Sequence, residues 1–126
     1  GPGSAALMLV GEQPGEREDA TGRPFIGPAG ALLNRALTQA GVPRERVYIT
    51  SAVKHFRHER RGHFRAGVTP GKAHIHACRP WLEVQMRVIR PGAVVCLGRI
   101  GALGVLERDV AVMKERGRIF ETAEGI

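Results

Sequence analysis

Residues 5–33 read AALMLVGEQPGEREDATGRPFIGPAGALL, and this stretch decides the fold. The apolar run at its start predicts a buried strand over Leu7–Val10. A loop rich in glycine and proline follows, and after it the apolar residues fall on one helical face, which predicts a helix over Pro28–Ala40. In an open α/β sheet, ligands bind in the loops at the carboxyl ends of strands. Residues 11–27 are therefore the first place to look for a functional site.

The same alternation of apolar strands and helical patterns continues along the chain. It predicts further strands and helices over Val47–Thr50, Lys72–Ile89 (interrupted by Pro80), Ala93–Leu97, Ile100–Leu106 and, as an edge strand, Arg118–Thr122. The strand at Ala93–Leu97 is apolar throughout, which is typical of a parallel strand buried on both faces. We expect a single α/β domain over residues 1–126, with three α/β/α layers around a central, mostly parallel sheet.

Length, hydropathy and cysteine content limit the class of protein and the cellular compartment to be expected. Its 126 residues are enough for one domain, and no apolar run reaches the ~20 residues of a membrane span. The two cysteines, Cys78 and Cys96, do not form a disulfide framework, and no signal peptide is visible. We expect a cytoplasmic monomer without a membrane partner.

A net charge of +7 favours a polyanionic partner, nucleic acid first. The charge gathers in residues 54–65, KHFRHERRGHFR, where Phe56 and Phe64 lie among the charges and only Glu59 opposes them. Basic side chains neutralise phosphates and aromatic rings stack on exposed bases, so this segment is the candidate DNA-binding surface. The alternative is a basic surface with no partner. The candidate phosphate contacts are Lys54, Arg57, Arg60, Arg61 and Arg65. Residues 54–71 are polar and contain glycine, which predicts a long loop.

Four segments in order carry a family resemblance. GEQPGEREDATGRPFIGPAGALLNRAL resembles the first motif of the uracil-DNA glycosylase superfamily, and VYITSAVKHF, ACRPWL and VVCLG follow as they do in that family. Within the superfamily, the chain resembles the iron–sulfur branch (family 4) and its X-type subgroup, which becomes covalently attached to the abasic sugar. The resemblance implies base-excision repair, in which the N-glycosidic bond of deoxyuridine in single-stranded or uracil-containing DNA is hydrolysed.

The resemblance also implies roles for residues of the first loop and the second strand. Gln13 and Glu16 become the candidate catalytic residues, which act on the attacking water and the departing sugar. Phe25 becomes the ring that stacks on the flipped-out base. Ser51 departs from the family, which has an asparagine here to read the base edge, and a serine cannot form that bidentate pair. The candidate substrate-binding residues are Gly11, Glu12, Phe25 and Ser51.

A [4Fe–4S] cluster is the cofactor that the resemblance implies for a complete family member. His55 and Cys78 correspond to two of its ligands, and a cluster of this kind needs four. The family supplies the others from a Cys-x-x-Cys pair before the first strand, and this sequence has no such pair. We therefore expect an incomplete ligand set and no cluster in this chain. Cys78 then has an alternative interpretation as an ordinary buried helix residue, and Cys96 is expected in the core.

Two further departures bear on activity. Gly67 stands where the X-type subgroup has its nucleophilic histidine, and glycine has no side chain that could attack the sugar. The family's His-Pro-Ser-like segment, whose histidine stabilises the departing base, has no match before Ile126. We expect little uracil release from this chain. Three hypotheses stay open: a uracil-DNA glycosylase, a non-catalytic DNA-binding relative, and a nucleotide- or phosphate-binding α/β domain that uses residues 11–16.

Overall fold

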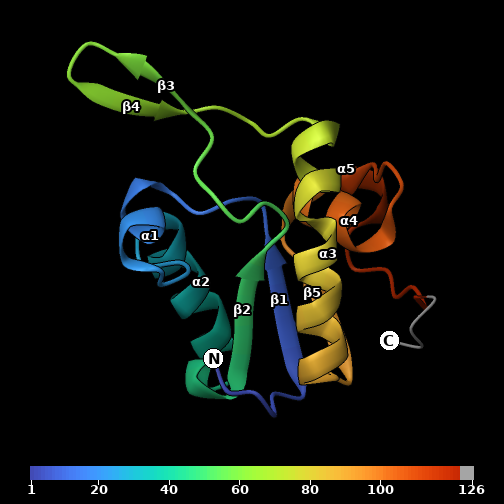
Figure 1. Ribbon diagram of the computed structural model, residues 1–126. Helices are drawn as coiled ribbons and strands as arrows, with labels where there is room; N and C mark the ends of the chain where they lie inside the picture. Colours follow the sequence, from blue (N-terminus) through green and yellow to red (C-terminus); the bar gives the residue numbers. More distant parts are fainter. Residues whose placement is uncertain (123–126) are drawn as a thin grey trace.

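A three-stranded parallel sheet forms the centre of the computed structural model, which describes residues 1–122 (Figure 1). Its strands are β1 (Leu7–Gly11), β2 (Val47–Ser51) and β5 (Ala93–Cys96), in the order β2-β1-β5. In register, Leu9 of β1 pairs with Ile49 of β2 and with Val95 of β5. The predicted set of three adjacent parallel strands is confirmed, with β1 in the middle.

Five α-helices and one 3₁₀ turn are present among the described residues. They are α1 (Glu16–Thr21), α2 (Pro28–Gln39), the 3₁₀ turn η1 (Arg44–Arg46), α3 (Lys72–Ile89), α4 (Gly98–Leu106) and α5 (Val112–Glu115). Pro80 lies inside α3 without ending it. The strand predicted over Arg118–Thr122 is wrong, because this segment is irregular. Ile119 there is 97% exposed, so this apolar side chain does not pack on the core as it would in an edge strand.

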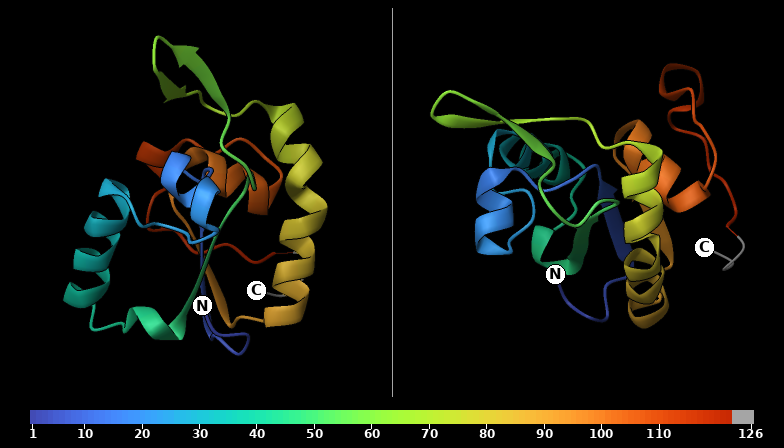
Figure 2. Two further views of the ribbon diagram at one scale, coloured as in Figure 1. Left: turned by 60° about the vertical axis from the view of Figure 1, so that its left-hand side comes forward. Right: turned by 45° about the horizontal axis from the view of Figure 1, so that its top comes forward.

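The two faces of the sheet are covered by different helices, which gives the predicted three layers (Figures 1 and 2). Side chains alternate along β1, so that Met8 and Val10 pack in one cluster with Leu82 and Met86 of α3. Leu9 points the other way and packs in a second cluster with Leu37 of α2. The sheet therefore has a core on each face.

One prediction about β5 is wrong. The apolar run at residues 93–97 was expected to be buried on both faces, but Ala93 is exposed and Val95 is 43% exposed. Val94 and Cys96 pack against the core cluster on the α3 side of the sheet. Because β5 is at an edge of the sheet, the face that α2 covers on β1 and β2 stays open on β5.

The predicted loop over residues 54–71 contains a β-hairpin instead. Strand β3 (His58–Arg61) pairs antiparallel with β4 (Phe64–Gly67) across a two-residue turn in which Gly62 has φ 61°. A positive φ at this turn suits glycine, which has no Cβ to clash. Figures 1 and 2 show that the hairpin stands away from the sheet, on the side where the strands end. No helix in residues 1–122 is both long and apolar enough to cross a membrane.

Candidate functional site

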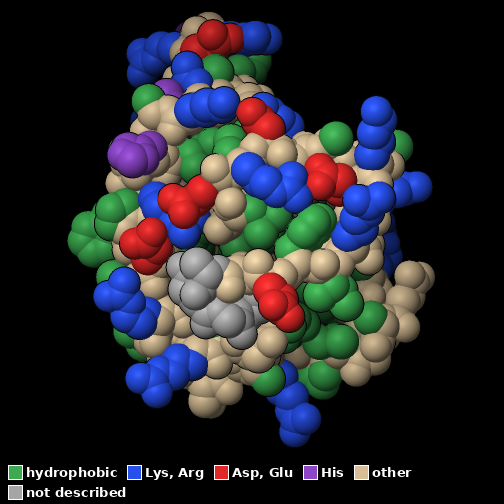
Figure 3. All heavy atoms as spheres, turned by 90° about the vertical axis from the view of Figure 1, so that its right-hand side faces the viewer, with side chains coloured by type: hydrophobic (Ala, Val, Ile, Leu, Met, Phe, Trp, Pro, Cys, Tyr) green, Lys and Arg blue, Asp and Glu red, His purple; other side chains and the backbone are tan. Residues whose placement is uncertain are grey.

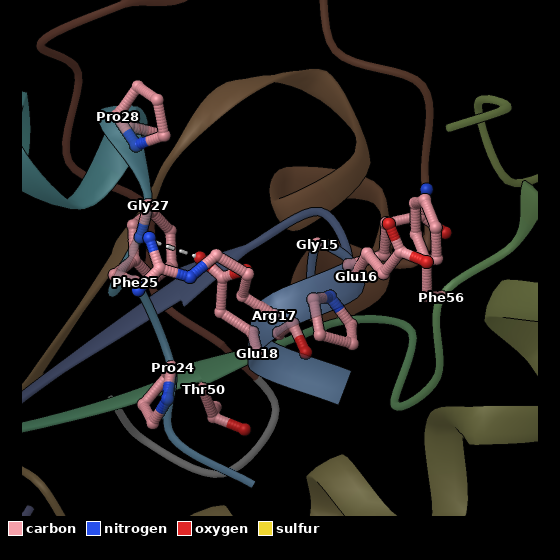
Figure 4. Close-up of a pocket in the computed structure, with 14 residues that line it drawn as sticks. Gly15, Glu16, Arg17, Glu18, Pro24, Phe25, Gly27, Pro28, Thr50 and Phe56 are labelled. Carbon is pink, nitrogen blue, oxygen red and sulfur yellow. Dashed lines mark hydrogen bonds between the residues drawn. The ribbon is translucent and has the colours of Figure 1, made fainter. Parts of the chain in front are cut away.

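A pocket of about 450 Å³ opens at the carboxyl ends of β1 and β2, beside α1 and the loop that leads into α2 (Figure 4). Its volume is in the range of small-molecule sites, ~300–1,000 Å³. Gln13, Glu16, Phe25 and Ser51 all line it, so the structure brings these four candidates from the sequence together. Gly11 and Glu12 are not among the lining residues. Gly11 ends β1 next to the pocket, and Glu12 is exposed.

Phe25 is held in an unusual backbone conformation. Its φ is 53°, in the left-handed region that a bulky residue rarely adopts. Strain of this kind costs about 1–3 kcal/mol and is often found at functional sites. The ring packs against the core cluster beneath α2 and also lines the pocket. Figure 4 shows Phe25 and Phe56 on opposite sides of the pocket in that view.

The amide of Gln13 is bonded to the stem of the hairpin. Its Oε1 accepts a hydrogen bond from the Arg57 N–H at 2.9 Å, and its Nε2 donates to the carbonyl oxygens of Arg57 at 3.3 Å and Val68 at 3.2 Å. The Val68 N–H in turn donates to the Arg57 carbonyl oxygen at 2.9 Å. Gln13 therefore fixes the hairpin where its two arms join the body of the protein.

Glu16 is the first residue of α1, and its side chain is half exposed. Its Oε1 lies 3.7 Å from Nε of Arg65 on the hairpin. This pair is a loose, solvent-exposed ion pair, so the carboxylate remains accessible from the pocket. Of the two candidate catalytic residues, Glu16 is the one with a free carboxylate edge, while the amide of Gln13 makes three protein hydrogen bonds.

Ser51 and Lys54 belong to a polar network between β2 and α3. The Ser51 hydroxyl donates to the Val53 carbonyl oxygen at 2.7 Å, which leaves it only as an acceptor towards a ligand. The Lys54 ammonium donates to the Ser51 carbonyl oxygen and to Gln85 Oε1, both at 2.6 Å, and to the Thr50 hydroxyl at 3.0 Å. Burial lowers the pKa of Lys54 to about 8. The ammonium is thus bonded to three acceptors on β2 and α3, and its contact with a phosphate stays a prediction.

The other four basic candidates belong to the hairpin and its stem. Arg57 donates to the Thr69 carbonyl oxygen at 2.7 Å and so braces the stem. Cross-strand pairing places Arg60 and Arg65 on one face of the hairpin, and Arg61 on the other. Arg61 is bonded to Glu59 at 2.6 Å. Figure 3 shows Lys and Arg side chains gathered at the top of the molecule, where Figure 1 places the hairpin.

The aromatic residues of the basic segment lie at different places. Phe56 lines the pocket and stacks on His58, with ring centroids 5.2 Å apart. Phe64 is 61% exposed and shares the outer face of the hairpin with Arg61. Phe56 was counted from sequence only as part of the basic segment, because nothing local showed that it turns back towards the pocket.

The candidate metal ligands lie on neighbouring segments. Cys78 Sγ accepts a hydrogen bond from the Lys54 N–H at 3.4 Å, and His55 follows Lys54 directly. His55 Nδ1 is 3.3 Å from Asp19 Oδ1 on α1. In residues 1–122, no three side chains of His, Cys, Asp or Glu gather as a metal site. His55 and Cys78 supply two of the four ligands, so the described residues alone do not fit a [4Fe–4S] cluster. Cys96 packs partly buried against the core, where burial raises the pKa of its thiol.

Two residues that the sequence did not reveal contact the Phe25 loop. The Glu18 carboxylate accepts hydrogen bonds from this loop, and the Arg44 guanidinium donates to it. Neither residue belongs to a recognisable sequence motif. Arg44 contacts a loop that lies about 20 residues away in the sequence. Glu18 reads as one acid in a charged stretch.

Comparison with known proteins gives a consistent set of relatives. The model of the uracil DNA glycosylase superfamily matches residues 1–123. A type-4 uracil-DNA glycosylase from Pyrobaculum aerophilum is 41% identical over 80% of this chain and 48% of its own length. Type-4 enzymes from Archaeoglobus fulgidus and Thermotoga maritima are 34% and 38% identical over 93% and 94% of this chain, and 57% and 59% of their own lengths. The chain thus spans about half the length of these curated relatives.

Proposed function

Because the chain belongs to the uracil-DNA glycosylase superfamily, we propose that it serves base-excision repair by hydrolysing the N-glycosidic bond of deoxyuridine in DNA. The observation that carries the proposal is the pocket at the carboxyl ends of β1 and β2, which both Phe25 and Glu16 line. A flipped-out pyrimidine needs an aromatic face in place of its lost stacking partners, and Phe25 can supply it. The relatives are named for the same reaction.

The pocket suggests a division of labour during bond cleavage. As the base departs, positive charge develops on the sugar, and a carboxylate nearby stabilises that charge or orients the attacking water. Glu16 is suited to this role, because its carboxylate is half exposed and lines the pocket. Gln13 supports the site indirectly, since its amide holds the hairpin stem above the pocket.

The hairpin is the proposed contact with the phosphate backbone. Arg60 and Arg65 share one face, and that face is turned towards α1, because Arg65 lies near Glu16. A strand that lies along this face passes next to the pocket mouth. The proposal leaves out Lys54 and Arg57, because the Lys54 ammonium donates to groups on β2 and α3 and the Arg57 guanidinium donates to the Thr69 carbonyl oxygen.

The proposal is tested with an oligonucleotide that contains a single deoxyuridine. The strand is incubated with the protein, treated with alkali to cleave abasic sites, and resolved on a gel. Matched strands with thymidine or cytidine report selectivity, and Glu16→Gln tests the carboxylate. We expect weak cleavage, of the uracil strand alone, and a further loss of about tenfold or more in Glu16→Gln. No cleavage of the uracil strand at any protein concentration would refute hydrolysis by this chain.

A non-catalytic DNA-binding role is the second candidate, and two observations favour it. The amide of Gln13 makes three hydrogen bonds to the hairpin stem, and the Ser51 hydroxyl donates to the Val53 carbonyl oxygen. Both reduce the groups that are free to act on a bound base. This candidate predicts that the protein binds the uracil and thymidine strands with the same affinity and releases neither base.

A further inference from the structure

The backbone of Phe25 is strained for a reason that differs from the other left-handed residues. Arg90 and Glu107 also have positive φ among the described non-glycine residues, but each ends a helix, where this conformation is common. Phe25 lies in the loop between α1 and α2, with no helix end to account for its φ of 53°. The surrounding structure must therefore hold it there.

Arg44 of η1 holds the loop from one side. Its Nη2 donates to the carbonyl oxygens of Pro24 at 2.8 Å and Phe25 at 3.2 Å, and its Nη1 donates to Oδ1 of Asn34 on α2. A guanidinium is planar and presents its donors in a fixed fork. It therefore sets the orientation of two successive peptide groups relative to α2, which a flexible single donor cannot do.

Glu18 of α1 holds the same loop from the other side. Its Oε1 accepts hydrogen bonds from the N–H groups of Ile26 at 3.2 Å and Gly27 at 3.0 Å, the two residues after Phe25. Figure 4 shows Gly27 beside the Glu18 carboxylate. Arg44 thus binds the carbonyl groups up to Phe25, and Glu18 binds the amide groups that follow it. Together they fix the chain on both sides of the strained residue.

Two glycines make room for the position that results. A Cβ at residue 30 would lie 1.8 Å from the Phe25 carbonyl oxygen, and a Cβ at residue 11 would lie 2.6 Å from Cζ of the ring. Side chains at these positions would displace either the backbone or the ring of Phe25. The ring is thus located by its own contacts as well as by the hydrogen bonds on its loop.

We propose that Arg44 and Glu18 are positioning residues that set the Phe25 ring as the stacking face for an extruded pyrimidine. Neither residue acts as a catalytic group, because both act on the ring only through the backbone around Phe25. The proposal rests on the proposed function for its substrate, since the stacking partner is the uracil base. The alternative is that both residues only stabilise the fold.

The first experiment reads the position of Phe25 directly. The chain has four phenylalanines, so 4-fluorophenylalanine gives four ¹⁹F resonances, which single Phe→Leu variants assign. Arg44→Lys, Arg44→Ala and Glu18→Gln should shift or split the Phe25 resonance and leave the Phe120 resonance in place. Arg46→Ala, on the exposed side of the same 3₁₀ turn, is the matched control. An unmoved Phe25 resonance in folded Arg44→Lys and Glu18→Gln would overturn the proposal.

The second experiment is a double-mutant cycle on binding to the single-uracil strand, with a strand that carries an abasic analogue as reference. Arg44→Ala should reduce the uracil-dependent part of the affinity at least fivefold, but by less than twofold when Phe25 is already alanine. Arg44→Lys should restore part of the loss. Equal losses in both backgrounds would overturn a role through Phe25. If the unmodified chain does not distinguish the two strands, the proposed function fails, and the ¹⁹F result still decides the positioning role.

Discussion

Several polar side chains at this site bond to other parts of the protein, which limits the groups that they offer to a ligand. Lys54 illustrates this, because its ammonium donates to three acceptors on β2 and α3 and the largest cause of its lowered pKa is burial. Gln13 is a second case, since its amide closes the hairpin stem. Sequence patterns identify both as polar residues near a strand end, but they do not show which way the side chains turn.

Lys54 should make stability depend on alkaline pH. Its pKa is about 8 in the folded protein and near its ordinary 10.5 in the unfolded chain. Between these values the unfolded chain binds the additional proton, so the free energy of unfolding rises with pH. Relative to Lys54→Met, the unmodified protein should gain about 1–2 kcal/mol between pH 7.5 and 10, since solvent screens part of the effect. Urea unfolding at several pH values measures this.

The exposed Lys114 supplies the control for that measurement. Lys114→Met should follow the unmodified protein across the same pH range. If the stability of Lys54→Met changes with pH in parallel with the unmodified protein, then Lys54 titrates normally and its ammonium is not held in the interior.

Gly67 is the residue at which covalent capture can be tested. A Cβ at this position lies 3.2 Å from Cε2 of Phe56, a ring that lines the pocket, so Gly67→His places an imidazole at the pocket rim after a small shift of Phe56. We expect no denaturation-resistant band with uracil-containing DNA from the unmodified protein, and such a band from Gly67→His, as the imidazole nitrogen bonds to the sugar carbon and uracil departs.

Ala66→His is the matched variant, because Ala66 pairs with Glu59 and faces the opposite side of the hairpin. It should give no band. A covalent band from the unmodified protein would contradict the prediction and would direct attention to His63, the imidazole in the hairpin turn.

Among the elements, those with an apolar face could be predicted from sequence and those without one could not. The strands β1 and β2 and the helices α2 and α3 carry apolar residues at strand or helix spacing, so their pattern shows them. Helix α1 has no buried residue, and all four residues of β3 are exposed. Hydrophobic periodicity has nothing to detect in such elements. The hydrogen bonds that Glu18 accepts from the Phe25 loop, and those between Gln13 and the hairpin stem, leave no local sequence pattern either.

The packing of α4 on β1 allows a test at this scale. Gly101 lies inside α4, where alanine usually stabilises a helix by ~1 kcal/mol. A Cβ at this position, however, would lie 2.3 Å from the Val10 carbonyl oxygen. Gly101→Ala should therefore destabilise the protein by about 1–3 kcal/mol, because α4 must move away from the sheet. Chemical denaturation measures the change.

Gly3→Ala is a suitable control, since a Cβ there meets nothing within 4 Å. It should leave the free energy of unfolding within about 0.5 kcal/mol of the unmodified value. A neutral or stabilising Gly101→Ala would mean that α4 and β1 are not in the close contact described.

At the scale of the whole molecule, the hairpin and the pocket form one surface at the end of the sheet where the strands stop. The net charge of +7 predicted a polyanionic partner, and the hairpin presents Arg60 and Arg65 on the side nearer the pocket. The position of the site could be predicted from the parallel sheet. The hairpin above it could not, because its charged strands resemble a loop in sequence.

DNA binding should be salt-dependent through this surface. If Arg60 contacts a phosphate, Arg60→Ala should reduce the slope of log affinity against log salt by about one unit. Fluorescence anisotropy with a labelled single strand at several salt concentrations measures the slope. Arg35→Ala, on the exposed side of α2, should leave the slope unchanged. Equal slopes for Arg60→Ala and Arg35→Ala would mean that Arg60 makes no phosphate contact and that the hairpin charge serves solubility alone.

The hydrogen bonds between Gln13 and the hairpin stem also determine which part of the hairpin unfolds locally most often. Bonds from Gln13 reach the backbone only at Arg57 and Val68, and the strands beyond carry no fully buried side chain. Native-state amide hydrogen exchange should therefore form a gradient, fastest beside the Gly62 turn and slowest at the stem. Gln13→Ala would flatten that gradient by letting the stem open as readily as the tip. The arginines would then approach DNA on a mobile hairpin, while amide exchange in β1 and β2 below the pocket should not change.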